Sequence, residues 1–184
     1  MSNLKNSNKQ KGNYAFIDAQ NMYMQVQKAG WRVDLFKFRV YLKEKYNIQK
    51  AFWFTGFLEE NQKFYNLLKK AGFECVFKEV SRGVNGKPKG NVDVDIPVSA
   101  LDLIAEYHGA VIITSDGDFA TLVKYLIGKD KFTAVLSPSR KDTSFLLRKA
   151  CGSKHELQYM DVLKSKIGYI NLNMSKQQKR PPRD

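Results

Sequence analysis

The side chains of this sequence with the clearest potential for chemistry are aspartates at three acidic sites. These sites are Asp18, Asp93 with Asp95, and Asp116 with Asp118. Carboxylates held close together repel one another, and a bound cation relieves that repulsion. Ligand sets made only of oxygen select hard cations, so Mg²⁺ or Mn²⁺ would be the natural occupant if the clusters met in space. Such a metal activates water and stabilises charge on a phosphate, which is the chemistry of phosphodiester hydrolysis.

The elements that carry these aspartates decide whether the clusters meet. An apolar run at 14–17 predicts a first strand that ends at Asp18. A second run at 110–114 predicts a fourth strand that ends just before Asp116. A helix predicted over about 92–108 begins at the remaining cluster and leads back into the fourth strand, so it runs antiparallel to the strands.

Other apolar patterns complete an alternation of strands and helices. The predicted strands lie at 48–57, 73–80, 132–136 and 156–159, and the predicted helices at 19–29, 35–46, 59–70, 118–128 and 143–150. Such alternation implies right-handed crossovers and a mainly parallel sheet with helices on both faces. The fold class is therefore α/β, a three-layer α/β/α Rossmannoid sandwich with five or six strands.

The predicted strand order is 3-2-1-4-5, in which the first and fourth strands are neighbours. Function in such a sheet gathers at the carboxyl edge, where the strand order reverses. Both strand ends and the start of the 92–108 helix fall at that edge, so all three acidic clusters are expected on one rim. Each aspartate alone is also explained as a helix cap or a turn residue. Their convergence favours a metal site.

The helix over 92–108 offers an apolar stripe at helical spacing, which predicts its buried face as Val94, Val98, Leu101 and Ala105. Between the third strand and this helix, residues 81–91 form a basic, glycine-rich stretch that predicts an exposed loop without regular structure.

The chain has a formal net charge of +13 at pH 7, and both ends as well as the middle are basic. This charge favours a polyanionic partner, with nucleic acid preferred to a membrane. Residues 1–12 and 169–184 are expected to be basic flexible tails around a single domain at 13–168. The sequence shows no apolar run long enough for a membrane span and no signal-peptide core, which predicts a cytoplasmic protein. A homodimer is compatible with the sequence.

Candidate nucleic-acid contacts surround the acidic clusters. Arg82, Lys87 and Lys89 on the glycine-rich stretch could grip phosphates on either side of a cut. Tyr23 could stack on a base if exposed, and core packing is the alternative. The hydroxyl of Ser115 could hold a water molecule or a phosphate.

Asn21 follows Asp18 by three residues at the start of a predicted helix, where it would face the same rim. Its side chain could orient a carboxylate, a water molecule or a phosphate, and simple helix capping is the alternative. Neither histidine lies near the acidic clusters, which argues against a metal-free, histidine-based ribonuclease mechanism.

Three blocks of the sequence, at 16–21, 89–96 and 114–119, closely resemble the signature blocks of the NYN domain, a PIN-like nuclease family that includes the LabA-like bacterial proteins. The resemblance covers roughly residues 13–160. It implies a PIN-like fold and a metal-dependent ribonuclease with a preference for single-stranded RNA, although composition alone does not separate RNA from DNA. It also implies a catalytic set, namely Asp18, Asp93, Asp116 and Asp118 with Asn21 in support.

One position departs from the family pattern. Many LabA-like members have a further acid where this chain has Ser99, and Asp95 lies four residues earlier on the same helical face. Asp95 could supply that charge as a metal ligand. The alternative is an RNA-binding or recruitment module with a weak or inactive site. A phosphatase is a second alternative, but the Asp-x-Asp pair that a phospho-aspartyl mechanism uses is missing, because Ala19 and Gln20 follow Asp18.

Overall fold

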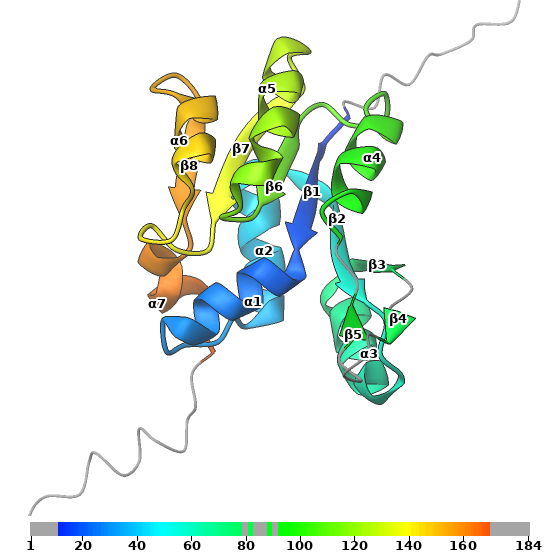
Figure 1. Ribbon diagram of the computed structural model, residues 1–184. Helices are drawn as coiled ribbons and strands as arrows, with labels where there is room; N and C mark the ends of the chain where they lie inside the picture. Colours follow the sequence, from blue (N-terminus) through cyan, green and yellow to red (C-terminus); the bar gives the residue numbers. More distant parts are fainter. Residues whose placement is uncertain (1–10, 79–80, 83–87, 90–91, 170–184) are drawn as a thin grey trace, which may run out of the picture.

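The computed structural model describes residues 11–78, 81–82, 88–89 and 92–169 (Figure 1). Six strands form its main sheet, namely β1 (Asn13–Asp18), β2 (Ile48–Gly56), β3 (Glu74–Lys78), β6 (Ala110–Ile113), β7 (Phe132–Ser137) and β8 (Glu156–Tyr159). Their order is β3-β2-β1-β6-β7-β8, and every neighbouring pair is parallel. The predicted order 3-2-1-4-5 is confirmed, with β8 as a sixth strand at the edge.

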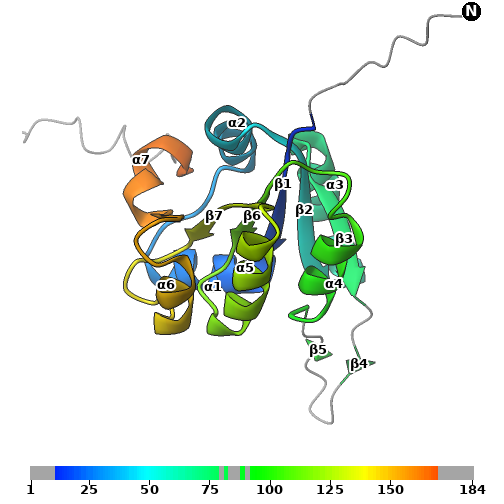
Figure 2. The same cartoon turned by 90° about the horizontal axis from the view of Figure 1, so that it is seen from above.

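Helices cover both faces of the sheet. The first face is covered by α1 (Ala19–Lys28), α2 (Leu35–Tyr46), α3 (Gln62–Ala71) and α7 (Lys164–Ile167). The second face is covered by α4 (Asp95–Asp102), α5 (Ala120–Gly128) and α6 (Phe145–Cys151). Figure 2 shows α2 and α7 on one side of the sheet and α4, α5 and α6 on the other. The three-layer prediction is therefore confirmed.

Strand β1 shows why the middle of a central strand is apolar. Ala15 and Ile17 pack into the core of the first face, whereas Phe16 packs into the core of the second face. Successive side chains of a strand point to opposite faces, so a strand covered on both sides has no position for a polar residue. After Asn13 at its start, β1 therefore carries its only charged side chain where it ends, at Asp18.

Helix α4 differs from its prediction in length and in orientation. Val94 and Val98 are 67% and 59% exposed, and the buried residues of the helix are Ile96 and Ala100. Leu101 and Ala105 are exposed as well. The predicted stripe was therefore wrong. The sequence offers a second stripe at Val92, Ile96 and Ala100, and this one packs on the second face of the sheet.

The early end of α4 at Asp102 follows from the burial of Tyr107. The Tyr107 ring is fully buried and lies 5.4 Å from the Tyr14 ring and 5.8 Å from the Phe16 ring. Its hydroxyl donates a 2.7 Å hydrogen bond to the Ala100 carbonyl. Because Tyr107 packs beneath α4, residues 103–106 form a turn, and the helix is shorter than the predicted 92–108.

The glycine-rich stretch contains a short antiparallel ladder, which corrects the expectation of a loop without regular structure. β4 (Ser81–Arg82) pairs with β5 (Pro88–Lys89), with Ser81 opposite Lys89. Lys87 lies outside the described residues, as do the side chains of Arg82 and Lys89 and most of the two predicted tails. Among the helices that the structure describes, none has the length and apolar character needed to cross a membrane.

Candidate metal centre

Three carboxylates meet at the carboxyl edge of the sheet. Asp93, Asp116 and Asp118 each present one oxygen, and these oxygens all lie within 4.8 Å of one another. Asp93 stands in the turn before α4, Asp116 follows β6, and Asp118 lies in the 3₁₀ turn Gly117–Phe119. Two segments far apart in sequence thus form one acidic triad. Asp93 and Asp116 are half-buried and Asp118 is exposed, so the triad is open to solvent on one side.

Asp18 is a buried carboxylate next to this triad. It ends β1 and is only 3% exposed. Its carboxylate accepts a 3.1 Å hydrogen bond from the Asn21 N–H and another of 3.1 Å from the Thr114 hydroxyl. Burial raises the Asp18 pKa to about 6, these hydrogen bonds oppose the rise, and the charges of Asp93 and Asp116 add to it. A positive ion at the rim would lower this pKa again.

Thr114 links the two halves of the rim, and it was not among the residues singled out from the sequence. Its hydroxyl donates to Asp18 and accepts a 3.2 Å hydrogen bond from the Asp116 N–H. The sequence signal was available, because a hydroxyl residue directly follows the buried apolar run of β6, next to Asp18 on the neighbouring strand.

Asn21 lies at the rim as predicted, and its side chain holds Ser115. The Asn21 side-chain oxygen accepts hydrogen bonds from the Ser115 N–H at 2.9 Å and from the Ser115 hydroxyl at 2.8 Å. Ser115 is buried, and its hydroxyl proton points to Asn21. The Asn21 side chain therefore fixes the backbone that leads into Asp116, and the Asp18 carboxylate caps α1 by accepting from the Asn21 N–H.

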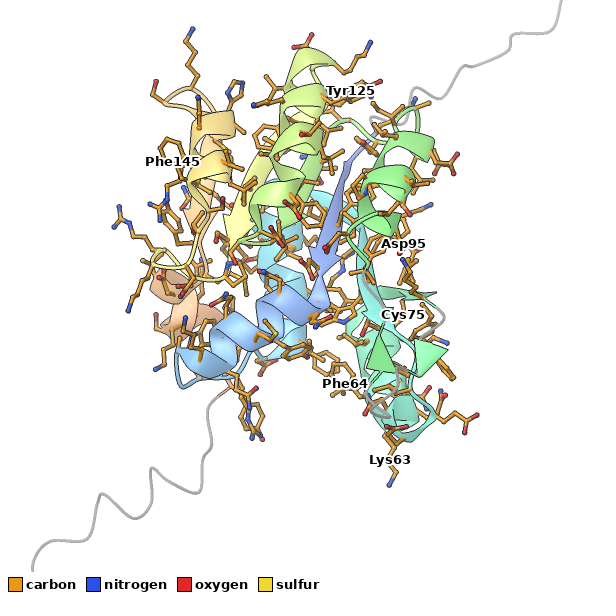
Figure 3. The ribbon with its side chains drawn as sticks, in the orientation of Figure 1. Lys63, Phe64, Cys75, Asp95, Tyr125 and Phe145 are labelled. Carbon is orange, nitrogen blue, oxygen red and sulfur yellow. The ribbon has the colours of Figure 1, made fainter. Side chains whose placement is uncertain are left out.

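Asp95 and Tyr23 lie away from the triad. The Asp95 carboxylate is 2.8 Å from the Lys78 ammonium at the end of β3, and Figure 3 shows Asp95 near the start of α4. Tyr23 is half-buried, and its ring contacts the rings of Trp53 and Phe64 at centroid distances of 5.7 Å and 5.8 Å. Burial raises the pKa of the Tyr23 hydroxyl, which keeps this side chain neutral.

Gly117 lets the backbone of the 116–118 turn lie close to Ser144, the residue that precedes α6. The Asp116 carboxylate accepts a 3.0 Å hydrogen bond from the Asp118 N–H across this glycine. A Cβ atom at Gly117 would collide with the side chain of Ser144. Ser144 caps α6 by accepting from the Leu146 N–H, and its own N–H donates to the Ser115 carbonyl at 3.0 Å.

Gly117→Ala should therefore destabilise the protein by about 1–3 kcal/mol, because the new methyl group displaces the Ser144 cap. Urea unfolding measures this effect. The second substitution Ser144→Gly, made in the Gly117→Ala variant, should recover part of the lost free energy by removing the collision. Gly128→Ala is the matched control, because a Cβ at Gly128 meets no atom within 4 Å. Equal losses for Gly117→Ala and Gly128→Ala would contradict the collision.

The donor set at this edge suits a hard cation. Its ligands are carboxylate oxygens, and the described cluster contains neither a sulfur nor an imidazole nitrogen. Mg²⁺ and Mn²⁺ bind such sites with a few carboxylates and complete their shells with water or substrate phosphate. Asp93, Asp116 and Asp118 could hold such an ion, with the buried Asp18 carboxylate adding negative charge behind them.

Comparisons with known proteins give the relatives of this chain. Residues 14–158 match the family model of the NYN domain. The low amplitude and bright protein LabA of Synechococcus elongatus is 27% identical over 132 residues, which cover 66% of this chain and 71% of that protein. A crystal structure of a protein of unknown function from Vibrio parahaemolyticus superposes with a TM-score of 0.72 at 20% identity, over 92% of this chain and 100% of that one. That likeness shows a shared fold.

Proposed function

The chain belongs to the NYN domain family, and from this membership and the acidic triad we propose that it is a divalent-metal-dependent ribonuclease that hydrolyses single-stranded RNA. The observation that carries the proposal is the approach of the Asp93, Asp116 and Asp118 oxygens to within 4.8 Å of one another at the switch point of the sheet. A bound cation would offset the repulsion between carboxylates so close together.

Each residue at the rim has a distinct part in this proposal. Asp93, Asp116 and Asp118 hold Mg²⁺ or Mn²⁺, which when bound supplies an activated water and stabilises negative charge on the phosphate. The buried Asp18 carboxylate adds negative charge next to the triad, and its two hydrogen bonds fix its orientation. Asn21 holds the Ser115 backbone, and so keeps Asp116 at its place beside Asp18.

The positions of the two histidines support a metal-based mechanism. His108 stands shortly before β6, and His155 stands immediately before β8. In a parallel sheet both residues therefore lie at the amino edge, opposite the acidic triad. General acid–base catalysis needs a group within hydrogen-bond reach of the reacting atoms. Proton transfer at the rim is thus left to water and carboxylates.

The net charge of +13 supports a nucleic-acid substrate. Arg82, Lys87 and Lys89 are proposed to bind phosphates beside the cut, because the segment that holds them leads directly into the turn of Asp93. The preference for RNA over DNA rests on the resemblance to the NYN family.

The test is cleavage of labelled single-stranded RNA and DNA of one sequence with Mn²⁺, with Mg²⁺ or with EDTA, beside an Asp116→Asn variant purified in the same way. We expect RNA to be cut with either metal, and neither the EDTA sample nor the variant to cut. Cleavage that persists in both would refute a metal mechanism. Tight RNA binding without cleavage under any metal would instead favour the RNA-binding module, for which Ser99 is the motivating departure.

A further inference from the structure

A cavity of about 320 Å³ opens beside the acidic centre, on the other side of the first turn of α1. Ala19 and Gln20 line it, and both directly follow Asp18 in the chain. The next residue, Asn21, contacts Ser115 on the side of the acidic centre. The first turn of α1 is therefore a shared wall, with the acidic centre on one side and the cavity on the other.

Aromatic rings form much of this cavity. Tyr23 comes from α1, Trp53 from β2, and Phe64 and Tyr65 from α3. In Figure 3 Phe64 lies between α1 and α3, in agreement with its ring contact to Tyr23 at 5.8 Å. Aromatic walls of this kind bind flat, unsaturated groups by stacking and edge contacts.

None of the residues that line the cavity is charged, although the chain is highly charged elsewhere. A phosphate would find no cation to pair with there, and burying it would be unfavourable. Gln20, Thr55 and Asn61 instead offer neutral hydrogen-bonding groups. The lining therefore suits a neutral planar ligand with a polar edge.

Trp53 supplies an independent observation. The Trp53 side chain is fully buried, and its indole N–H has no hydrogen-bond partner among the described residues. A buried donor without an acceptor is unfavourable. The ring itself is held by edge contacts with Tyr23, Phe64 and Phe73, so its orientation is fixed. The indole nitrogen itself lies below the molecular surface, so Trp53 serves as a rigid wall of the cavity and not as a donor to a ligand.

We infer that this cavity is a nucleobase subsite, which takes the base of a nucleotide next to the phosphate that lies at the acidic centre. The side chains of Gln20 and Asn61 reach the polar edge of the base, and Trp53 forms the rigid wall behind it. Tyr23 and Phe64 supply the stacking surface. The inference rests on the nucleic-acid substrate proposed above, and it adds that the protein holds this substrate by a base as well as by phosphates.

The test measures binding in EDTA, so that it does not depend on cleavage. Trp31→Phe leaves Trp53 as the single tryptophan of the chain, because the sequence has only two. Trp31 does not line this cavity. In the Trp31→Phe variant, a nucleoside 5′-monophosphate should change the Trp53 fluorescence in a saturable manner, whereas ribose 5-phosphate should not. An unchanged Trp53 signal at saturating nucleotide would overturn the inference.

A second measurement tests the aromatic lining. Tyr23→Leu removes one ring of the stacking surface, so it should weaken binding of a labelled single-stranded RNA on the order of 5- to 10-fold. Trp31→Phe is the matched control and should bind as wild type does. Gln20→Ala on the exposed first turn of α1 should weaken binding without touching the core, which separates recognition from folding.

These results separate the subsite from the proposed activity. Base-dependent binding without any cleavage would support the subsite and contradict the nuclease. Metal-dependent cleavage with equal binding by wild type, Tyr23→Leu and Gln20→Ala would support the nuclease and overturn the subsite.

Discussion

Asp93→Asn should lower the metal-dependent cleavage rate on the order of 100-fold, whereas Asp95→Asn should leave that rate within about threefold of wild type. The two aspartates are separated by one residue, but only Asp93 presents an oxygen to Asp116 and Asp118. Asp95 pairs with Lys78 at 2.8 Å. Removal of one ligand charge weakens the site, whereas removal of a partly exposed ion pair changes stability by only about 1 kcal/mol or less.

Single-turnover cleavage at saturating RNA and a fixed Mn²⁺ concentration measures this difference. Thermal unfolding with and without Mn²⁺ provides a readout that is independent of catalysis, because a cation that binds only the folded state raises the melting temperature. Asp93→Asn should lose that rise and Asp95→Asn should keep it. The reverse pattern would mean that Asp95 is the ligand on this segment and supplies the charge missing at Ser99.

Asp18→Asn should stabilise the metal-free protein at pH 8 by up to about 3 kcal/mol. The Asp18 carboxyl has a pKa of 3.8 as a model group and about 6 in the folded protein. The folded state therefore holds the proton more tightly than the unfolded state. The contribution of Asp18 to wild-type stability is therefore most favourable below about pH 4, declines between pH 4 and 6, and carries the full cost of the buried charge above pH 6. Asparagine cannot ionise, so the gain should vanish near pH 4.

Urea unfolding in EDTA at pH 4, 6 and 8 measures this dependence. Asp130→Asn is a suitable control, because Asp130 is exposed and its left-handed backbone, with φ of 53°, also accepts asparagine. The same Asp18→Asn substitution should weaken metal-dependent cleavage, since the rim loses a negative charge. A gain of equal size at all three pH values would contradict a buried ionised carboxylate and indicate a packing effect instead.

Much of the acidic centre could be predicted from the sequence, because topology alone sends certain residues to one edge. Parallel strands place Asp18 and Asp116 at neighbouring carboxyl ends, and the reversal of strand order lies between them. Neither step requires knowledge of side-chain packing. The sequence pattern also predicted the edge strand Glu156–Tyr159, although this strand is short.

Features that depend on packing could not be predicted in this way. Two apolar stripes compete for the buried face of α4, and periodicity cannot decide between Val94 and Ile96. The ion pair between Asp95 and Lys78 depends on the rotation of α4 relative to β3. Trp53 shows the same limit, because its place in an apolar run predicts burial but does not reveal the cavity beside it.

The joining of β1 to β6 also bears on how the protein folds. The hydrogen bond from Thr114 to Asp18 connects residues 96 positions apart, and the contact between Asn21 and Ser115 spans 94 positions. Pairing of parallel strands over such separations requires closure of a long loop. The chain loses conformational entropy on closure before stabilising contacts form, so this pairing is slow. A partly synthesised chain that ends before β6 contains Asp18 and Asp93 but no acidic triad. The cation affinity proposed for the triad would therefore arise only when the central strands have paired, and it would serve as a kinetic probe of that late step.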